Sequence, residues 1–208
     1  MVRTEILTKY FPDLDAEKIH QFEKLERIYA IENEKVNLIS RKDFEHLFTN
    51  HILHSLSLAK TCSVLPGQKV LDIGTGGGFP GIPLAIMFPQ TTFILCDSIG
   101  KKIRAVQAII DGLELKNAFA VNDRTEQLNI QFDIAVARAV APMAKLWDWM
   151  AGKWKNKALF YLLKGGDLSE EMNELLLIAP NVKIQEFPIK NIFSEEYFET
   201  KKVLLIKE

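Results

Sequence analysis

The chain has 208 residues, of which 48% are hydrophobic and 25% are charged, as is usual for a globular domain with a proper buried core. Its net charge of −1 excludes a general attraction to nucleic acid, so any RNA binding must rely on local basic patches. The two cysteines have no metal-ligand or disulfide spacing, and we expect one cytoplasmic domain, residues 1–208, with neither an apolar leader nor a membrane partner.

Residues 1–64 are predicted to form a helical N-terminal extension that packs on the rest of the domain. After a short lead, Asp15 is placed to cap a helix that runs to about residue 34, with apolar residues at helical spacing. A second helix is expected over residues 43–62, and a Pro-Gly pair ends it before the first strand.

The second of these helices carries three histidines, His46, His51 and His54. Histidines three residues apart on a helix invite interpretation as metal ligands. We expect no metal site, because no acidic or cysteine ligand stands at a compatible spacing. Surface or partly packed histidines are the simpler interpretation.

The stretch from residue 69 to Asp97 predicts a strand, a glycine loop, a helix and a second strand. The first strand is expected at residues 70–73, the helix at 82–88 and the second strand at 91–96. Glycine permits positive φ angles and lets the backbone approach a ligand closely. In an open α/β sheet such a loop lies at the crevice beyond the carboxyl end of the first strand. Asp97, at the end of the second strand, is placed to accept hydrogen bonds from ribose hydroxyls.

Two cofactors fit this loop. Residues 76–81 satisfy G-x-G-x-x-G, the pattern of dinucleotide sites, whereas residues 72–78 satisfy D-x-G-x-G-x-G, the pattern of S-adenosylmethionine methyltransferases. The second pattern is favoured because its glycines directly follow the strand and Asp72 puts an acid near the cofactor's amino-acid end. In addition, Pro80 lacks the backbone N–H that a pyrophosphate would need. A tight turn that needs glycine for backbone reasons alone is the remaining interpretation.

The rest of the chain continues to alternate helices with strands. Helices are predicted near residues 100–112, 142–150 and 168–178, and strands at 118–122, 132–137, 158–163, 182–189 and 203–206. Arg138 closes the fourth strand, and an arginine at the end of an apolar strand indicates either a function or an ion pair with an acid such as Asp72. Lys164 likewise stands at the carboxyl end of the fifth strand. This order fits a class I S-adenosylmethionine-dependent methyltransferase: a Rossmann-like α/β fold whose seven-stranded, mostly parallel sheet is flanked by helices.

The chain resembles the small-subunit ribosomal RNA guanosine-N7 methyltransferases, the glucose-inhibited division protein B family, in DIGTGGGFPGIPLAI and in LCDSIGKKIRAVQ. The resemblance covers nearly the whole chain and includes NLISRKD near Asn37, HILHS at residues 51–55, ARA at 137–139 and YLLKGG at 161–166. The sequence departs from the family at His54, where aspartate is usual, and at residues 200–202, where arginine and histidine are often found.

Together with the residue patterns, the resemblance implies a site. The expected cofactor is S-adenosylmethionine, and the expected partner of a monomeric enzyme is 16S ribosomal RNA, in the small ribosomal subunit or its precursor. The cofactor is expected to contact Asp72, Gly74, Gly76, Gly78, Phe79, Asp97, Thr125, Glu126 and Arg138. Arg138 and Lys164 are the expected catalytic residues. RNA contacts are expected from Lys101, Lys102, Arg104, Lys201, Lys202 and His51.

The target atom decides what the site must do. Guanine N7 carries an in-plane lone pair and no proton, so methyl transfer to it requires alignment but no general base. Arg138 and Lys164 are therefore assigned to phosphate, the cofactor carboxylate or base O6. Two other functions stay open: a methyltransferase that acts on a small molecule or protein, and a non-catalytic nucleotide-binding module or NAD-dependent oxidoreductase.

Overall fold

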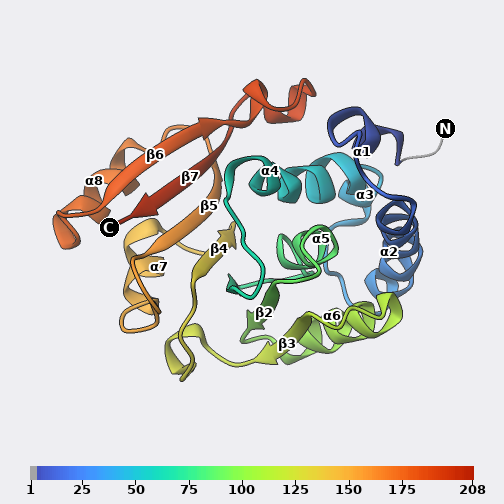
Figure 1. Ribbon diagram of the computed structural model, residues 1–208, viewed down its shortest axis with the longest axis horizontal. Coiled ribbons are helices and arrows are strands. Elements are labelled where there is room, and N and C mark those ends of the chain that lie inside the picture. The colour runs from blue at the N-terminus through green and yellow to red at the C-terminus, as the bar shows by residue number, and fades with distance from the viewer. Residues whose placement is uncertain (1–3) are drawn as a thin grey trace.

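Seven strands form one sheet in the order β3-β2-β1-β4-β5-β7-β6 in the computed structural model, which describes residues 4–208 (Figure 1). The strands are β1 (Lys69–Ile73), β2 (Thr92–Asp97), β3 (Ala118–Asn122), β4 (Ile134–Arg138), β5 (Leu159–Gly165), β6 (Lys183–Pro188) and β7 (Lys201–Lys207). The first five are parallel to one another, whereas β7 runs antiparallel between β5 and β6. The predicted seven-stranded, mostly parallel sheet is therefore confirmed.

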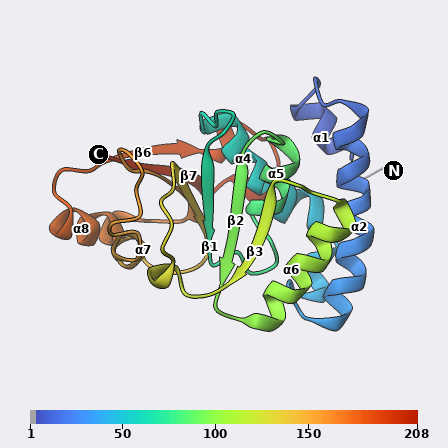
Figure 2. The same ribbon diagram turned by 60° about the horizontal axis from the view of Figure 1, so that its bottom comes forward.

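Alternate side chains of each strand enter two separate cores, one on each face of the sheet. Val70 and Leu95 belong to the core covered by α1 (Glu5–Tyr10), α2 (Ala16–Lys35), α4 (His54–Thr61), α5 (Gly81–Met87) and α6 (Gly100–Leu113). Leu71 and Ile73 belong to the core covered by α7 (Met143–Trp149) and α8 (Ser169–Ile178). Figure 2 shows α2 beside α6 on one side of the molecule and α7 beside α8 on the other.

The helical extension begins earlier than the sequence pattern predicts. α2 starts as expected, because the Asp15 side chain accepts a hydrogen bond from the backbone N–H of Lys18 at 2.8 Å. The short lead predicted before it is wrong over residues 5–10, which form α1 and bury Leu7 in the core. Six residues are too few for a helical repeat to be visible in the sequence.

The helix predicted over residues 43–62 is helical for most of its length but is not one continuous α-helix. The segment comprises α3 (Arg41–Phe44), a π-helix η1 (Leu47–Leu53) and α4. A π-helical turn has no apolar repeat of its own, so the sequence pattern shows a continuous helix. Three 3₁₀ turns complete the fold: η2 (Thr125–Gln127), η3 (Ile189–Asn191) and η4 (Glu196–Phe198). None of the helices within residues 4–208 has both the length and the apolar character needed to span a membrane.

Candidate active site

The loop after β1 turns over a buried carboxylate. Gly74, Gly76 and Gly78 have φ angles of 60°, 58° and 89°, which residues with a side chain rarely adopt. Beneath the loop, Asp72 Oδ2 accepts hydrogen bonds from the Thr75 hydroxyl at 2.6 Å and from the first backbone N–H of α5 at 2.8 Å. Burial raises the pKa of Asp72 to about 7. Asp72 therefore shapes the loop from below and does not line the cavity beside it.

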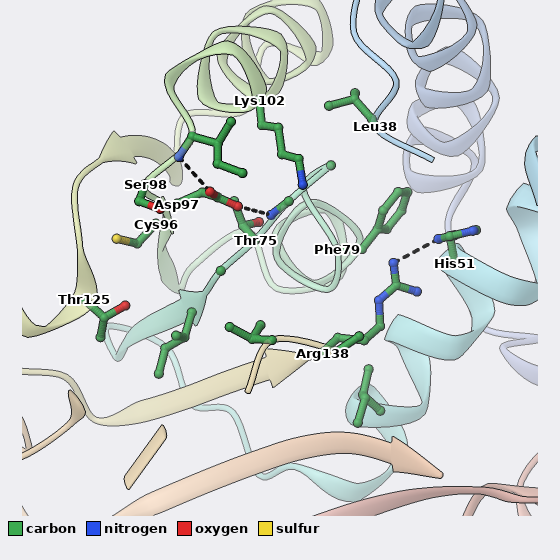
Figure 3. Close-up of a pocket in the computed structure, with 18 of the residues that line it drawn as sticks. Leu38, His51, Thr75, Phe79, Cys96, Asp97, Ser98, Lys102, Thr125 and Arg138 are labelled. Carbon is green, nitrogen blue, oxygen red and sulfur yellow. Dashed lines mark hydrogen bonds between the residues drawn. The ribbon is translucent and has the colours of Figure 1, made fainter. Parts of the chain in front are cut away.

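Asp97 ties the end of β2 to this loop (Figure 3). Its Oδ2 accepts a hydrogen bond from the Gly76 backbone N–H at 3.0 Å, and its Oδ1 accepts one from the Ile99 backbone N–H at 2.8 Å. A carboxylate offers about four lone-pair positions, so each oxygen can accept a further bond. Asp97 lines the cavity and keeps the acceptor capacity that ribose hydroxyls would use.

A cavity of about 710 Å³ extends along the carboxyl ends of the parallel strands. Its lining includes many of the residues predicted from the sequence. In the order of the strands, these are Thr125 and Glu126 after β3, Asp97 of β2, Gly74, Gly76 and Phe79 after β1, Arg138 of β4 and Lys164 of β5. Because β7 is antiparallel to β5, Lys201 at its start reaches the same edge of the sheet. Gly78 is not part of the lining, and a Cβ at this position would lie 2.4 Å from Ile82 Cδ1.

The Arg138 guanidinium is held by the helical extension. Its Nη1 donates to the Asn50 carbonyl oxygen at 3.1 Å. Its Nη2 donates to His51 Nδ1 at 2.9 Å, as Figure 3 shows. The guanidinium also lies 5.1 Å from the centre of the Phe79 ring. On the other side of the imidazole, His51 Nε2 pairs with the Asp43 carboxylate. Both ring nitrogens of His51 are thus engaged within the protein, which leaves neither of them free for the predicted RNA contact.

Electrostatics at this end of the cavity follow from burial. Burial lowers the pKa of Arg138 below its usual value, partly opposed by nearby tyrosines and acids. Burial, and after it the charge of Arg138, lower the pKa of His51 to about 4. Lys164 Nζ donates to the Ala141 carbonyl oxygen at 2.9 Å and forms an ion pair with Glu171 at 2.7 Å. Arg138 does not form the ion pair with Asp72 that was considered from the sequence, because its guanidinium donates to Asn50 and His51 instead.

The basic residues predicted to contact RNA do not all reach the cavity. Lys102 and Lys201 line it, and Lys201 Nζ lies 5.1 Å from the centre of the Tyr197 ring. The remaining three lie outside the lining: Lys101 and Arg104 are exposed on α6, and Lys202 forms an ion pair with Glu186 at 2.7 Å.

Several lining residues were not found by the sequence patterns. Trp149 and Tyr197 lie far apart in the chain, and no motif marks them. Leu38 falls within NLISRKD, but nothing in that pattern singles it out. The one signal that could have indicated Tyr197 is its position, because it is an aromatic residue shortly before the strand that starts with Lys201. Its hydroxyl lies 3.4 Å from Nδ1 of His54, the buried histidine where the family usually has aspartate.

The end of the cavity near Asp97 fits S-adenosylmethionine. A Cβ built on Gly76 would have no neighbour closer than the Gly74 carbonyl oxygen at 3.8 Å, so the backbone there borders open space. The Asp97 carboxylate and the Thr125 hydroxyl complete a lining at this end that is suited to ribose and adenine. No group of three or more His, Cys, Asp or Glu side chains in residues 4–208 is arranged to hold a metal ion.

Comparison with known sequences identifies close relatives over nearly the full length. Residues 18–187 match the GidB family model, described as rRNA small subunit methyltransferase G. A Christiangramia forsetii protein named Ribosomal RNA small subunit methyltransferase G is 48% identical over 210 residues, which cover 97% of this chain and 96% of the relative. The protein of the same name from Flavobacterium johnsoniae is 50% identical over 206 residues, with 96% and 95% coverage.

Solved structures with much lower identity share the architecture. A SAM dependent methyltransferase from Aquifex aeolicus matches with a TM-score of 0.58 at 14% identity, over 81% of this chain and 98% of that one. A mutant of MtNAS in complex with S-adenosylmethionine matches with a TM-score of 0.59 at 14% identity, over 90% and 71% of the two chains. The chain therefore belongs to the rRNA small subunit methyltransferase G family and has the fold of S-adenosylmethionine-dependent methyltransferases.

Proposed function

We propose that the protein transfers a methyl group from S-adenosylmethionine to N7 of a guanosine in 16S ribosomal RNA. The relatives that match nearly its whole length bear the name of a small-subunit ribosomal RNA methyltransferase. The observation that carries the proposal is the cavity, whose lining combines the glycine loop and Asp97 with cations that include Arg138, Lys164 and Lys201. This arrangement offers one region for a nucleoside cofactor and another for an anionic nucleic acid.

The residues on the β2 and β3 side would hold the cofactor. Asp97 would accept hydrogen bonds from ribose hydroxyls, and Thr125 and Glu126 would contact the adenine. The open backbone at Gly76 would allow close approach, and Asp72 would act indirectly by holding the loop in shape. When bound, S-adenosylmethionine supplies a methyl group attached to a positively charged sulfur.

The residues on the β4 and β5 side would position the target. Guanine N7 has an available lone pair, so the protein needs to orient the base and exclude water rather than remove a proton. His51 suits this requirement, because a group with a pKa of about 4 is a weak base at neutral pH. N7-methylguanine is cationic, so Arg138 and Lys164 would bind phosphate, the cofactor carboxylate or base O6 rather than stabilise the charge of the product.

The RNA would approach the cavity between Lys102 and Lys201, with the more remote Lys101 and Arg104 as further phosphate contacts. Guanine N7 lies in the deep major groove of an A-form helix, which side chains cannot read. The target guanosine should therefore lie in an irregular or opened region, or be reached before the subunit is fully assembled. We further infer that the protein acts as a monomer in the cytoplasm.

Two measurements test the proposal. Calorimetry should show binding of S-adenosylhomocysteine and none of NAD, which separates a methyltransferase from an oxidoreductase. Radiolabelled methyl transfer should then be measured on small ribosomal subunits and on purified 16S RNA, both from cells that lack this protein, with large subunits as the control. Label confined to small-subunit RNA and recovered as 7-methylguanosine supports the proposal. Label in another nucleoside, or in protein, contradicts it.

A further inference from the structure

The π-helical turn of η1 leaves one backbone carbonyl for Arg138. In an α-helix the backbone N–H of His54 would donate to the carbonyl of Asn50, four residues earlier. Here it donates to the carbonyls of Thr49 and His51 instead. The Asn50 carbonyl oxygen accepts Arg138 Nη1 at 3.1 Å and the Tyr197 hydroxyl at 3.4 Å. The local irregularity thus provides the first of the two hydrogen bonds that hold the guanidinium.

The second hydrogen bond fixes the position of a proton on His51. A guanidinium has only donors, so His51 Nδ1, which lies 2.9 Å from Arg138 Nη2, must be the acceptor. In a neutral imidazole the proton is then on Nε2, which donates it to the Asp43 carboxylate. The same ring in the other tautomer would place an N–H against the N–H of Arg138, and this contact would be lost.

Asp43 accepts from two donors at once. Its Oδ1 accepts a hydrogen bond from Asn50 Nδ2 at 2.8 Å, and its Oδ2 accepts one from His51 Nε2. The N-cap of α3 helps to fix its position, because the Ser40 hydroxyl accepts a hydrogen bond from the Asp43 backbone N–H at 3.1 Å. Asparagine at position 43 would keep one acceptor oxygen for His51 if the Asn50 amide turns over and accepts from the new NH₂ group, whereas leucine would offer no acceptor to either neighbour.

We propose that Asp43 is a positioning residue for methyl transfer: its carboxylate holds His51 in the Nε2–H tautomer, and His51 in turn holds Arg138 beside Phe79. Asp43 itself does not line the cavity, so its effect on the reaction must pass through His51 and Arg138. The proposal rests on the proposed function, because that function gives Arg138 its importance.

Two substitutions of Asp43 test the proposal. Asp43→Leu removes both acceptor oxygens, so His51 Nε2–H loses its partner and the ring should no longer be held in one tautomer. Asp43→Asn is the conservative variant: once the Asn50 amide turns over to accept from the new NH₂ group, the new amide oxygen can accept from His51 Nε2. Asp13→Asn, in an exposed loop, is the control for loss of one negative charge.

Two measurements are needed, one of the His51 tautomer and one of the methyl-transfer rate, and the first does not depend on the reaction. Long-range ¹H–¹⁵N NMR, with His51 assigned through His51→Gln, reports the tautomer without any reaction. Single-turnover methyl transfer to small subunits reports whether Arg138 is held in place, and Asp43→Leu should lower its rate on the order of 10- to 100-fold, the effect of a misplaced contact. The affinity for S-adenosylhomocysteine and the melting temperature of each variant show whether it is folded.

We expect the wild type and Asp43→Asn to show the Nε2–H tautomer and most of the rate, whereas Asp43→Leu shows neither. A wild-type Nδ1–H tautomer contradicts the proposal. A folded Asp43→Leu that reacts at the wild-type rate also contradicts it. So does Asp43→Asn if it keeps the tautomer without the rate. If the wild type methylates no ribosomal RNA, the proposed function fails, while the tautomers of the three proteins still decide whether Asp43 controls His51.

Discussion

Gly76→Ala should separate the need for backbone freedom from the need for space. The residue has a φ of 58°, and a Cβ there would enter the open cavity, with its closest neighbour 3.8 Å away. Alanine at a left-handed φ costs about 1–2 kcal/mol of folding stability. The new methyl group would also occupy space beside Asp97 that the cofactor should fill. An inserted methyl group in a well-packed contact costs typically about 1–3 kcal/mol, which is roughly a 5- to 150-fold loss of affinity.

Gly67→Ala is the matched control. Gly67 has a φ of 79°, also borders open space and lies in the turn before β1, outside the cavity lining. Both variants should therefore lose similar stability in urea, with melting temperatures lowered by roughly 2–4 °C per kcal/mol for a chain of this size. Only Gly76→Ala should lose affinity for S-adenosylhomocysteine in calorimetry. Equal affinities in the two variants would refute the placement of the cofactor against the loop.

Four further predictions follow from the same geometry. Asp97→Ala should weaken binding of S-adenosylhomocysteine by roughly 1.5–3 kcal/mol, the range for hydrogen bonds to a charged group; wild-type affinity in calorimetry would rule out its ribose contact. Lys101→Glu should flatten the dependence of RNA binding on salt by about one unit per lost phosphate contact, and an unchanged slope would make Lys101 a merely solvated residue. Because the pKa of His51 is lowered to about 4 by burial and Arg138, the single-turnover rate should show no inflection between about pH 6 and 8; a titration near pH 6.5 that His51→Gln removes would show proton abstraction. Because burial raises the pKa of Asp72 to about 7, the native state holds more protons than the unfolded state between about pH 4 and 7, so this carboxyl lowers stability as the pH rises through that range. The free energy of unfolding of Asp72→Asn should therefore rise relative to that of the wild type between about pH 4 and 7, by about 4 kcal/mol at most. Urea unfolding of both proteins at these two pH values measures the difference, and a difference that stays constant would contradict the prediction.

Strand ends were the most predictable part of the site. Asp97, Arg138 and Lys164 each stand at or near the end of an apolar run, and parallel strands bring their carboxyl ends to one edge of the sheet. The glycine loop was likewise visible, because three of its glycines have backbone angles that other residues rarely adopt. These features depend on local chain geometry, which the sequence encodes directly.

The basic residues show how a small error in a boundary changes a site. The sequence pattern starts the last strand at residue 203, whereas β7 starts at Lys201. Neighbours on a strand point to opposite faces, so Lys201 and Lys202 cannot both reach the cavity. Lys101 and Lys102 are likewise about 100° apart around α6, and only Lys102 lines the cavity.

The hydrogen bonds that hold Arg138 were not predictable from local sequence patterns. Its partners, the Asn50 carbonyl and the His51 ring, are 88 and 87 residues away in sequence. A π-turn takes the His54 N–H away from this carbonyl, and such a turn has no apolar repeat to reveal it. This part of the site depends on how the helical extension docks on the sheet, and only the folded structure shows that.

The most direct test of the central claim is nucleoside mass spectrometry of 16S ribosomal RNA from cells with and without this protein. We predict that deletion removes 7-methylguanosine from one position of the small-subunit RNA. A plasmid copy of the wild type should restore it, and a copy with Gly76→Val, which should not bind the cofactor, should leave it absent. An unchanged amount of 7-methylguanosine in the deleted strain, or the loss of a different methylated nucleoside, would contradict the account.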